Sequence, residues 1–234
     1  MAEGILLVGG SGLIGRQVLP LLLRQQRDAQ VFAAQRKPPA FGDPRLQPIV
    51  GELQGEGGEQ RIASAIRAAG VRLDTLICCL GTTRRAAGSD AAFAAVDRDL
   101  VLRVAQLARK LGAQHALLVS SVGAAADSRN FYLRVKGEAE TGIAALGFTR
   151  CDFLRPGLLR GARDEHRPGE ALAQRLAPLL DPLLIGALQR YRSITAADVA
   201  AALVALCGKV APGRFVHFNP ALRDLAHGLS VAAQ

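Results

Sequence analysis

The sequence predicts an α/β fold: a doubly wound parallel sheet in one domain. Short apolar runs that resemble buried strands alternate along the chain with amphipathic helical patterns. The first run ends in three glycines, after which a helical pattern begins. With 234 residues, 50% of them hydrophobic, the chain can bury a sizeable core. We therefore expect a single domain over residues 1–234, of which about 157–234 contributes a small substrate-side lobe.

The elements follow in order along the chain. We expect strands at 5–8, 30–35, 46–50, 73–80, 116–120, 151–154 and 215–218. We expect helices near 13–26, 60–69, 90–111, 132–146 and 196–206, and a further helical stretch that contains Pro178 and Pro182. Thr195 and Asp198 form a capping-box-like start to the last of the five, and the charged segment 160–170 is expected to be an exposed loop. Because ligands of such sheets bind beyond the carboxyl ends of the strands, the turns after these strands should surround one crevice.

The turn after the first strand is the strongest functional signal. Its glycines have the spacing Gly-x-x-Gly-x-x-Gly, at Gly9, Gly12 and Gly15. Glycines at such a turn allow a tight bend, close approach of the backbone to a pyrophosphate, and close packing of the helix on the strand. The N-terminus of the following helix offers free N–H groups to phosphates. The turn therefore predicts a dinucleotide site; the alternative is an ordinary glycine-rich turn.

The end of the second strand distinguishes the two nicotinamide cofactors. An acidic residue there would bind the ribose 2′-hydroxyl of NAD, whereas arginine accommodates the 2′-phosphate of NADP. Here Gln35 is followed by Arg36 and Lys37, without an acid. We therefore expect NADP (NADPH), with NAD less favoured and a flavin less favoured still, although Arg36 and Lys37 would also suit a solvated turn.

A second constellation suggests the chemistry. Tyr132 and Lys136 are spaced i, i+4 on an expected helix, so their side chains share a face. Ser120 and Ser121 come at the end of a strand, on the ligand side of the sheet. A lysine ammonium favours the phenolate of a nearby tyrosine, which helps it to exchange a proton with a carbonyl oxygen. Ser121 would donate to the same oxygen. The alternative is an amphipathic helix with an exposed Tyr and Lys.

Composition argues against several other classes. The formal net charge is +9, but 25 arginines and four lysines are scattered rather than clustered, and we expect no nucleic-acid partner. No apolar run is long enough to span a bilayer, and the N-terminus leads directly into a strand, so we expect no membrane association and a cytoplasmic location. The four cysteines read as buried, reduced thiols, and no residues have metal-ligand spacing.

Three further strings carry a resemblance to a known family. They are Cys-Cys-Leu-Gly-Thr-Thr-Arg at 78–84, Asn-Phe-Tyr-Leu-Arg-Val-Lys-Gly-Glu-Ala-Glu at 130–140, and Phe-Leu-Arg-Pro-Gly at 153–157 with Glu-His-Arg-Pro-Gly-Glu at 165–170. Together with the glycine turn they resemble the atypical branch of the short-chain dehydrogenase/reductase superfamily, and within it the Tat-interacting protein group. The likeness extends to about Leu206.

The resemblance implies a Rossmann-like domain that binds NADPH, and it assigns roles. Gly9, Ser11, Gly12, Leu13, Ile14 and Gly15 would cradle the pyrophosphate. Arg36, with Lys37, would hold the 2′-phosphate. Other residues would line the cofactor or lie beside the nicotinamide: Leu80, Gly81, Thr82, Ser120, Tyr132, Lys136, Pro156 and Gly157. One departure concerns Asp97, because the superfamily often has Asn there; this puts a relay role at that position in doubt.

Three functional hypotheses remain. The first is an NADPH-dependent oxidoreductase that reduces a small-molecule carbonyl substrate through Ser121, Tyr132 and Lys136. The second is an NADPH-binding, redox-sensing regulatory protein with little turnover, against which the intact trio argues. The third is a nucleotide-sugar epimerase or dehydratase, against which the small C-terminal lobe argues. A homodimer through the helices at 90–111 and 132–146 is an expectation that the superfamily suggests.

Overall fold

A parallel sheet of seven strands forms the centre of the molecule. The computed structural model describes residues 3–55, 57–161 and 181–232. The strand order is β3-β2-β1-β4-β5-β6-β9, and every neighbouring pair is parallel. The bounds are β1 Glu3–Val8, β2 Gln30–Gln35, β3 Leu46–Val50, β4 Arg72–Cys78, β5 His115–Val119, β6 Arg150–Arg155 and β9 Gly213–Phe218. The order reverses at β1, which places the crevice between β1 and β4 at the carboxyl ends.

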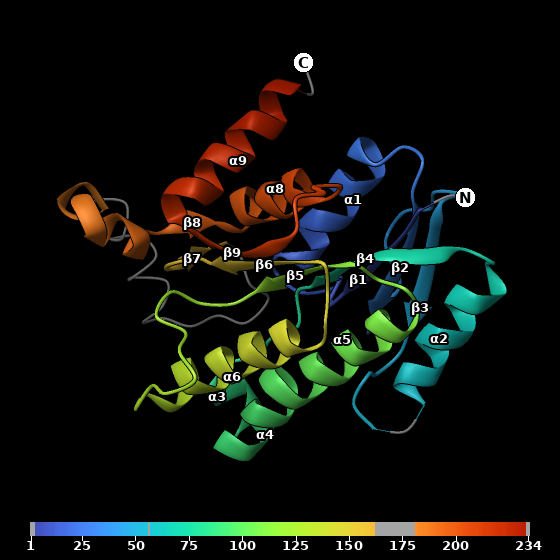
Figure 1. The fold of residues 1–234 in the computed structure, drawn as a ribbon, viewed down its shortest axis with the longest axis horizontal. Helices are drawn as coiled ribbons and strands as arrows, with labels where there is room; N and C mark the ends of the chain where they lie inside the picture. The colour runs from blue at the N-terminus through green and yellow to red at the C-terminus, as the bar shows by residue number, and fades with distance from the viewer. Residues whose placement is uncertain (1–2, 56, 162–180, 233–234) are drawn as a thin grey trace.

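Helices cover both faces of this sheet (Figure 1). One face carries α1 (Gly15–Gln25), α8 (Ala196–Leu206) and α9 (Asn219–Ala232). The other carries α2 (Gly58–Ala68), α5 (Val101–Lys110) and α6 (Phe131–Ala145), with the short α3 (Arg84–Ala87) and α4 (Asp90–Ala94) beside them. The three layers confirm the doubly wound, Rossmann-like fold.

The alternation of side chains along the central strands builds two cores. In β1, Ile5 and Leu7 pack with α1 and α8, whereas Leu6 and Val8 pack toward α2 and α5. Both sets are essentially inaccessible to solvent. A strand buried on both faces reads as a continuous apolar run, which is why the sequence pattern located these strands.

The expected elements are confirmed with shifts of a few residues at their ends. The main difference is the helix expected at 90–111, which consists of α4, a π-helical segment η1 (Ala95–Leu100) and α5. The structure also contains α3 and α9, which the periodicity did not predict. Thr195 and Asp198 form the expected capping box, with both of its hydrogen bonds present.

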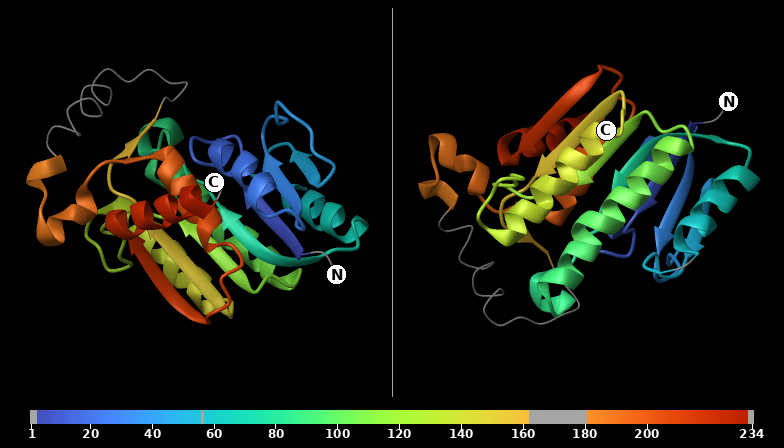
Figure 2. Two further views of the ribbon diagram at one scale, coloured as in Figure 1. Left: turned by 90° about the horizontal axis from the view of Figure 1, so that it is seen from above. Right: turned by 60° about the horizontal axis from the view of Figure 1, so that its bottom comes forward.

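The C-terminal third divides between the main domain and a small appendage. Helix α8 packs on α1 and α9, and β9 extends the main sheet beside β6. A separate two-stranded sheet pairs β7 (Leu159–Arg160) with β8 (Ile194–Thr195), and the 3₁₀ turns η2 (Asp181–Leu183) and η3 (Gly186–Tyr191) project at the side of the molecule (Figure 2). Pro182 therefore lies in a 3₁₀ turn. Pro178 and nearly all of the expected loop 160–170 lie outside the described residues.

Candidate active site

The turn between β1 and α1 needs glycine at two positions for different reasons. Gly9 has a φ of +83°, and a Cβ there would lie 2.8 Å from the carbonyl carbon of Cys79, just after the neighbouring strand β4. A Cβ at Gly15 would lie 2.1 Å from the carbonyl oxygen of Gly9. Gly12 is different, because a Cβ there would approach only the Gly9 oxygen, at 3.3 Å. The first and third glycines therefore shape the turn, whereas the second keeps its open side clear.

A cavity of about 370 Å³ lies beside this turn, at the carboxyl ends of β1, β2, β3 and β4. Most residues of its wall are small or apolar, as suits a flat nucleotide, and the larger polar ones are Gln35, Arg36, Glu52 and Gln54. The predicted cofactor residues on its wall are Gly9, Ser11, Gly12, Arg36, Leu80, Gly81 and Thr82. The structure adds Ala34, Gln35, Gly51, Glu52, Leu53, Gln54, Cys79, Ala86, Ala87, Ala92, Val96 and Leu100.

The N-terminus of α1 opens toward the same region. Within the described part of the chain, no side chain caps the first turn of α1, whose N-cap position is Ile14. The N–H groups of Arg16 and Gln17 donate to the backbone carbonyls of Gly12 and Ile14, so it is the positive end of the helix dipole that favours an anion at this end. Ile14 itself is buried in the core between the sheet and α8. Neither Leu13, Ile14 nor Gly15 contributes to the cavity wall.

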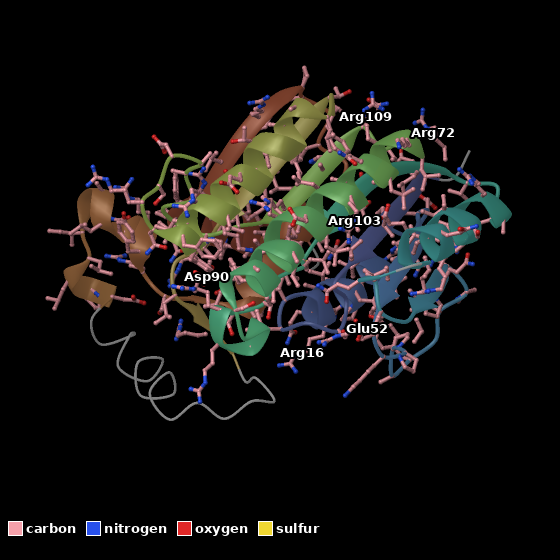
Figure 3. All side chains as sticks on the ribbon, turned by 90° about the horizontal axis from the view of Figure 1, so that it is seen from below. Arg16, Glu52, Arg72, Asp90, Arg103 and Arg109 are labelled. Carbon is pink, nitrogen blue, oxygen red and sulfur yellow. The ribbon has the colours of Figure 1, made fainter. Side chains whose placement is uncertain are left out.

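The cavity carries both a cation and a carboxylate near its mouth. Arg36, just after β2, is exposed and reaches the wall, whereas Lys37 does not contribute to it. Glu52 follows β3 and lies on the same wall. Figure 3 shows Glu52 and Arg16 toward the carboxyl ends of the strands, and Arg72 and Arg109 toward the opposite end of the molecule. Sequence reasoning missed Glu52, because it follows the third strand rather than the second; an acid directly after a strand that ends at the crevice was the available signal.

The expected pair of Tyr132 and Lys136 lies on α6. Asn130 caps this helix, and its side-chain oxygen accepts a hydrogen bond from the N–H of Leu133. The Tyr132 ring packs against Phe93 of α4, with 5.4 Å between ring centroids. Lys136 is buried, with 6% of its surface exposed, although most lysines extend into water. Its burial shows that its ammonium has an internal role.

Asp97 is the partner of this buried ammonium. The Lys136 Nζ atom lies 2.7 Å from Oδ1 of Asp97, and Asp97 is fully buried in η1. Its other carboxylate oxygen accepts the backbone N–H of Thr82 at 2.8 Å. Burial by itself lowers the pKa of Lys136, but Asp97, Tyr132 and a hydrogen bond to Asp97 outweigh it, and the pKa lies above its ordinary value. The sequence marked position 97 as unusual, but only the fold shows its partner.

Gly81 connects this ion pair with the cavity. It lies on the cavity wall, and a Cβ at this position would lie 3.4 Å from Oδ1 of Asp97 and 3.6 Å from Nζ of Lys136. The ammonium therefore lies directly behind the wall that the turn after β4 contributes. Tyr132 and Lys136 are not themselves part of that wall.

The two serines after β5 differ in their surroundings. Ser120 is buried, and its hydroxyl oxygen finds no hydrogen-bond partner in the described part of the chain. Ser121 is partly exposed, and its hydroxyl makes only a long contact of 3.4 Å to the carbonyl of Val122. The N–H of Val122 donates to the carbonyl of Pro156, which brings the predicted 156–157 segment beside the serines. A buried hydroxyl without a partner is costly, and a ligand would satisfy it.

Gly157 has its own anchor in this region. Its N–H donates to the side-chain oxygen of Asn219 at 2.9 Å, and a Cβ at Gly157 would lie 2.3 Å from the carbonyl oxygen of Arg192. These contacts tie the segment after β6 to the end of η3 and to the start of α9. Ser120, Pro156 and Gly157 thus gather at the ends of β5 and β6, outside the cavity beside β1.

The described residues contain neither a candidate metal site nor a candidate membrane-spanning helix. No group of three or more His, Cys, Asp or Glu side chains in the part of the chain that the structure describes could hold a metal ion. No helix among the described residues is long and apolar enough to cross a membrane. All four cysteines are free, and burial raises the pKa of Cys78 to about 11.

Comparisons with known proteins give the family of this chain. A family described as NAD(P)H-binding matches residues 9–209. Rat protein HTATIP2 is 38% identical over 173 residues, covering 74% of this chain and 69% of its own. The mitochondrial protein fmp52 of Emericella nidulans is 35% identical over 213 residues, covering 89% and 91%. The fold, the glycine turn and the family match define an NAD(P)-binding Rossmann protein.

The chain belongs to the NAD(P)H-binding family, in the atypical short-chain dehydrogenase/reductase branch that includes HTATIP2 and Fmp52. Solved structures share the fold at low identity. A yeast short-chain dehydrogenase/reductase superposes with a TM-score of 0.69 at 15% identity, covering 95% of this chain and 99% of its own. The NAD complex of Thermus thermophilus UDP-glucose 4-epimerase gives 0.65 at 17%, covering 98% and 83%.

Proposed function

We propose that this protein is an NADPH-dependent oxidoreductase that reduces a small-molecule carbonyl compound. The observation that carries the proposal is the buried ammonium of Lys136 directly behind Gly81 of the cofactor cavity, one helical turn from Tyr132. A lysine in this position can reach both a bound cofactor and the phenol. When bound, the dihydronicotinamide supplies the hydride for the carbonyl carbon.

The cradle supports a nucleotide cofactor. The open side of Gly12, the positive end of the α1 helix dipole and the small residues of the wall suit a pyrophosphate. Arg36 is the residue for the 2′-phosphate, since a guanidinium binds phosphate oxygens through two parallel hydrogen bonds. Glu52 is the carboxylate of this wall, but it follows β3, whereas the acid that binds the ribose of NAD follows the second strand. We therefore base the proposed NADPH preference on Arg36.

Residues of the chain supply the proton, orient the cofactor and donate hydrogen bonds to the carbonyl oxygen. Tyr132 protonates the carbonyl oxygen as it becomes an alkoxide, and Lys136 orients the cofactor and holds positive charge near the phenol. Ser121 donates a hydrogen bond to the same oxygen. Ser120, with its buried hydroxyl, supplies a second donor on the cofactor side.

Fluorescence titration with NADPH and, in parallel, NADH tests the cofactor. Selective binding of NADPH, followed by turnover in a screen of carbonyl compounds, is the expected result. Selective binding without turnover of any carbonyl would favour the regulatory protein instead. Binding of neither nucleotide would contradict the proposal.

The epimerase alternative rests on fold likeness alone, because the epimerases among the solved structures share less than a fifth of their residues with this chain. We also propose a cytoplasmic location.

The fungal relatives are named as mitochondrial proteins, so a mitochondrial location is the competing possibility. Fluorescence microscopy of a tagged copy distinguishes the two locations.

A further inference from the structure

Asp97 closes a buried charge pair in the middle of the candidate active site. It lies in the π-helical segment η1, and such wide turns occur often at functional sites. Its two oxygens have different partners: Oδ1 is 2.7 Å from the ammonium of Lys136, and Oδ2 accepts the N–H of Thr82 at 2.8 Å. Asp97 therefore fixes both the lysine and the turn that lines the cavity.

Groups from three elements act on Lys136. Asp97 belongs to η1, Tyr132 lies one turn earlier on α6, and the thiol of Cys78 comes from the end of β4. One turn later on α6, the carboxylate of Glu140 is already paired with Arg155, at 2.6 and 3.0 Å. Asp97 is therefore the carboxylate that balances the ammonium.

Charge balance shows what this pair does to the phenol. While Asp97 is ionised and Lys136 is protonated, the buried pair is neutral. Loss of a proton from either the partly exposed Tyr132 or the buried Lys136 then leaves a net negative charge beside the fully buried carboxylate of Asp97, which is unfavourable. With an uncharged amide at position 97, the same two residues would carry a net positive charge before that loss and none after it. The carboxylate therefore resists the first deprotonation.

We propose that Asp97 is a positioning residue that keeps Tyr132 and Lys136 both protonated, and thereby sets the site for carbonyl reduction rather than alcohol oxidation. This rests on the proposed function. Reduction adds a hydride to the carbonyl carbon and a proton to its oxygen, and the bound dihydronicotinamide is oxidised. The phenol of Tyr132 supplies the proton and regains one from solvent. Oxidation of an alcohol runs the other way and needs the phenolate as base, which Asp97 disfavours.

The composition of the chain allows a direct test without substrate. It contains two tyrosines and no tryptophan, so in a Tyr191→Phe background the ultraviolet absorbance of phenolate reports Tyr132 alone. Tyr191 is exposed at the end of η3, where its ring lies against the guanidinium of Arg190. The four lysines make the ammonium signal of Lys136 assignable by ¹⁵N NMR against a Lys136→Met reference.

The expected results concern the first proton that the pair loses. In the Tyr191→Phe protein, Tyr132 and Lys136 should both remain protonated at pH 8. Adding Asp97→Asn should move the first deprotonation, at whichever residue it occurs, down by about one pH unit or more. Asp99→Asn is the matched control, because Asp99 pairs with Arg98 and not with Lys136. It should leave the midpoint in place.

Either of two results would overturn the inference. One is a phenolate of Tyr132 that forms below pH 8 in the Tyr191→Phe protein, which can be measured even if the Asp97 variant does not fold. The other is a folded Asp97→Asn protein with an unchanged first midpoint. Because this titration needs no substrate, it is independent of the proposed function. With a substrate in hand, Asp97→Asn should shift the alkaline limb of kcat/KM for reduction to lower pH.

Discussion

The imidazole of His115 lies 2.7 Å from the carboxylate of Asp152, on the neighbouring strand of the sheet. The same Asp152 oxygen accepts a bond of 2.6 Å from Arg150, and its other oxygen lies 2.7 Å from Nε2 of His217. Because an ionised carboxylate only accepts hydrogen bonds, both imidazoles donate to it. One fully buried carboxylate therefore ties β5, β6 and β9 together, away from the cofactor cavity.

Asp152→Asn should destabilise the protein by about 3–5 kcal/mol, because the variant leaves Arg150 buried without its carboxylate. Denaturant unfolding followed by circular dichroism measures this loss. Asp127→Asn, at an exposed position, is the matched control and should stay within about 0.5 kcal/mol of the parent. Equal stabilities of the two variants would show that the cluster contributes nothing to folding.

The same cluster predicts an acid-sensitive fold. Burial by itself raises the pKa of Asp152, but the hydrogen bonds from His115, His217 and Arg150 outweigh it and hold the pKa well below its ordinary value. A lowered pKa in the folded state contributes stability above the unfolded pKa of about 3.9, and this is lost as the pH falls through the folded value. The stability difference between the parent and Asp152→Asn should therefore shrink below about pH 4. Unfolding curves from pH 3 to pH 7 measure it, and a constant difference would contradict this assignment.

Gly12→Ala and Gly15→Ala should separate ligand binding from folding. A Cβ at Gly15 would overlap the Gly9 oxygen, so we expect a loss of about 1–3 kcal/mol in the free energy of unfolding. A Cβ at Gly12 meets that oxygen only at 3.3 Å, so stability should change by less than about 1 kcal/mol. Since Gly12 lies on the cavity wall, its variant should instead bind NADPH about tenfold more weakly or worse. A Gly12→Ala protein with the parental NADPH affinity would show that the pyrophosphate does not bind against Gly12.

Arg36→Ala should weaken NADPH binding by about 10- to 100-fold, because a charge-assisted contact to the 2′-phosphate is lost. Its affinity for NADH, which lacks that phosphate, should change little. Fluorescence titrations with both nucleotides compare the two losses. Arg27→Ala serves as the control, since Arg27 is exposed near the opposite end of β2. Equal losses of affinity for NADPH and NADH would show that Arg36 does not bind the 2′-phosphate.

Tyr132→Phe should lower the rate of carbonyl reduction by about 10²- to 10⁴-fold, because the proton donor is removed. The NADPH affinity should remain nearly unchanged, since Tyr132 lies off the cavity wall. Steady-state kinetics and titration give the two quantities. Tyr191→Phe is the matched control and should keep the parental rate. An active Tyr132→Phe protein would refute the catalytic assignment.

Local patterns in the sequence predicted most of the helices and strands. Buried parallel strands are continuous apolar runs, which the sequence shows directly. Thr195 and Asp198 predicted the start of a helix, because a capping box involves only residues close together in the chain. The helix α9 was missed, as was the π-helical turn at Ala95–Leu100. Packing against the rest of the domain decides such features, because periodicity hardly distinguishes a π turn from a regular helix.

The sequence by itself determined the parallel sheet, the glycine turn and the helical face shared by Tyr132 and Lys136, because each depends on residues close together in the chain. Only the tertiary structure decided that Asp97 faces Lys136, that Glu52 joins the cavity wall, and that one carboxylate gathers His115 and His217. These residues are tens of positions apart. The free energy of such contacts comes from excluding water around charges, and strand order, not local pattern, decides which charges are buried together.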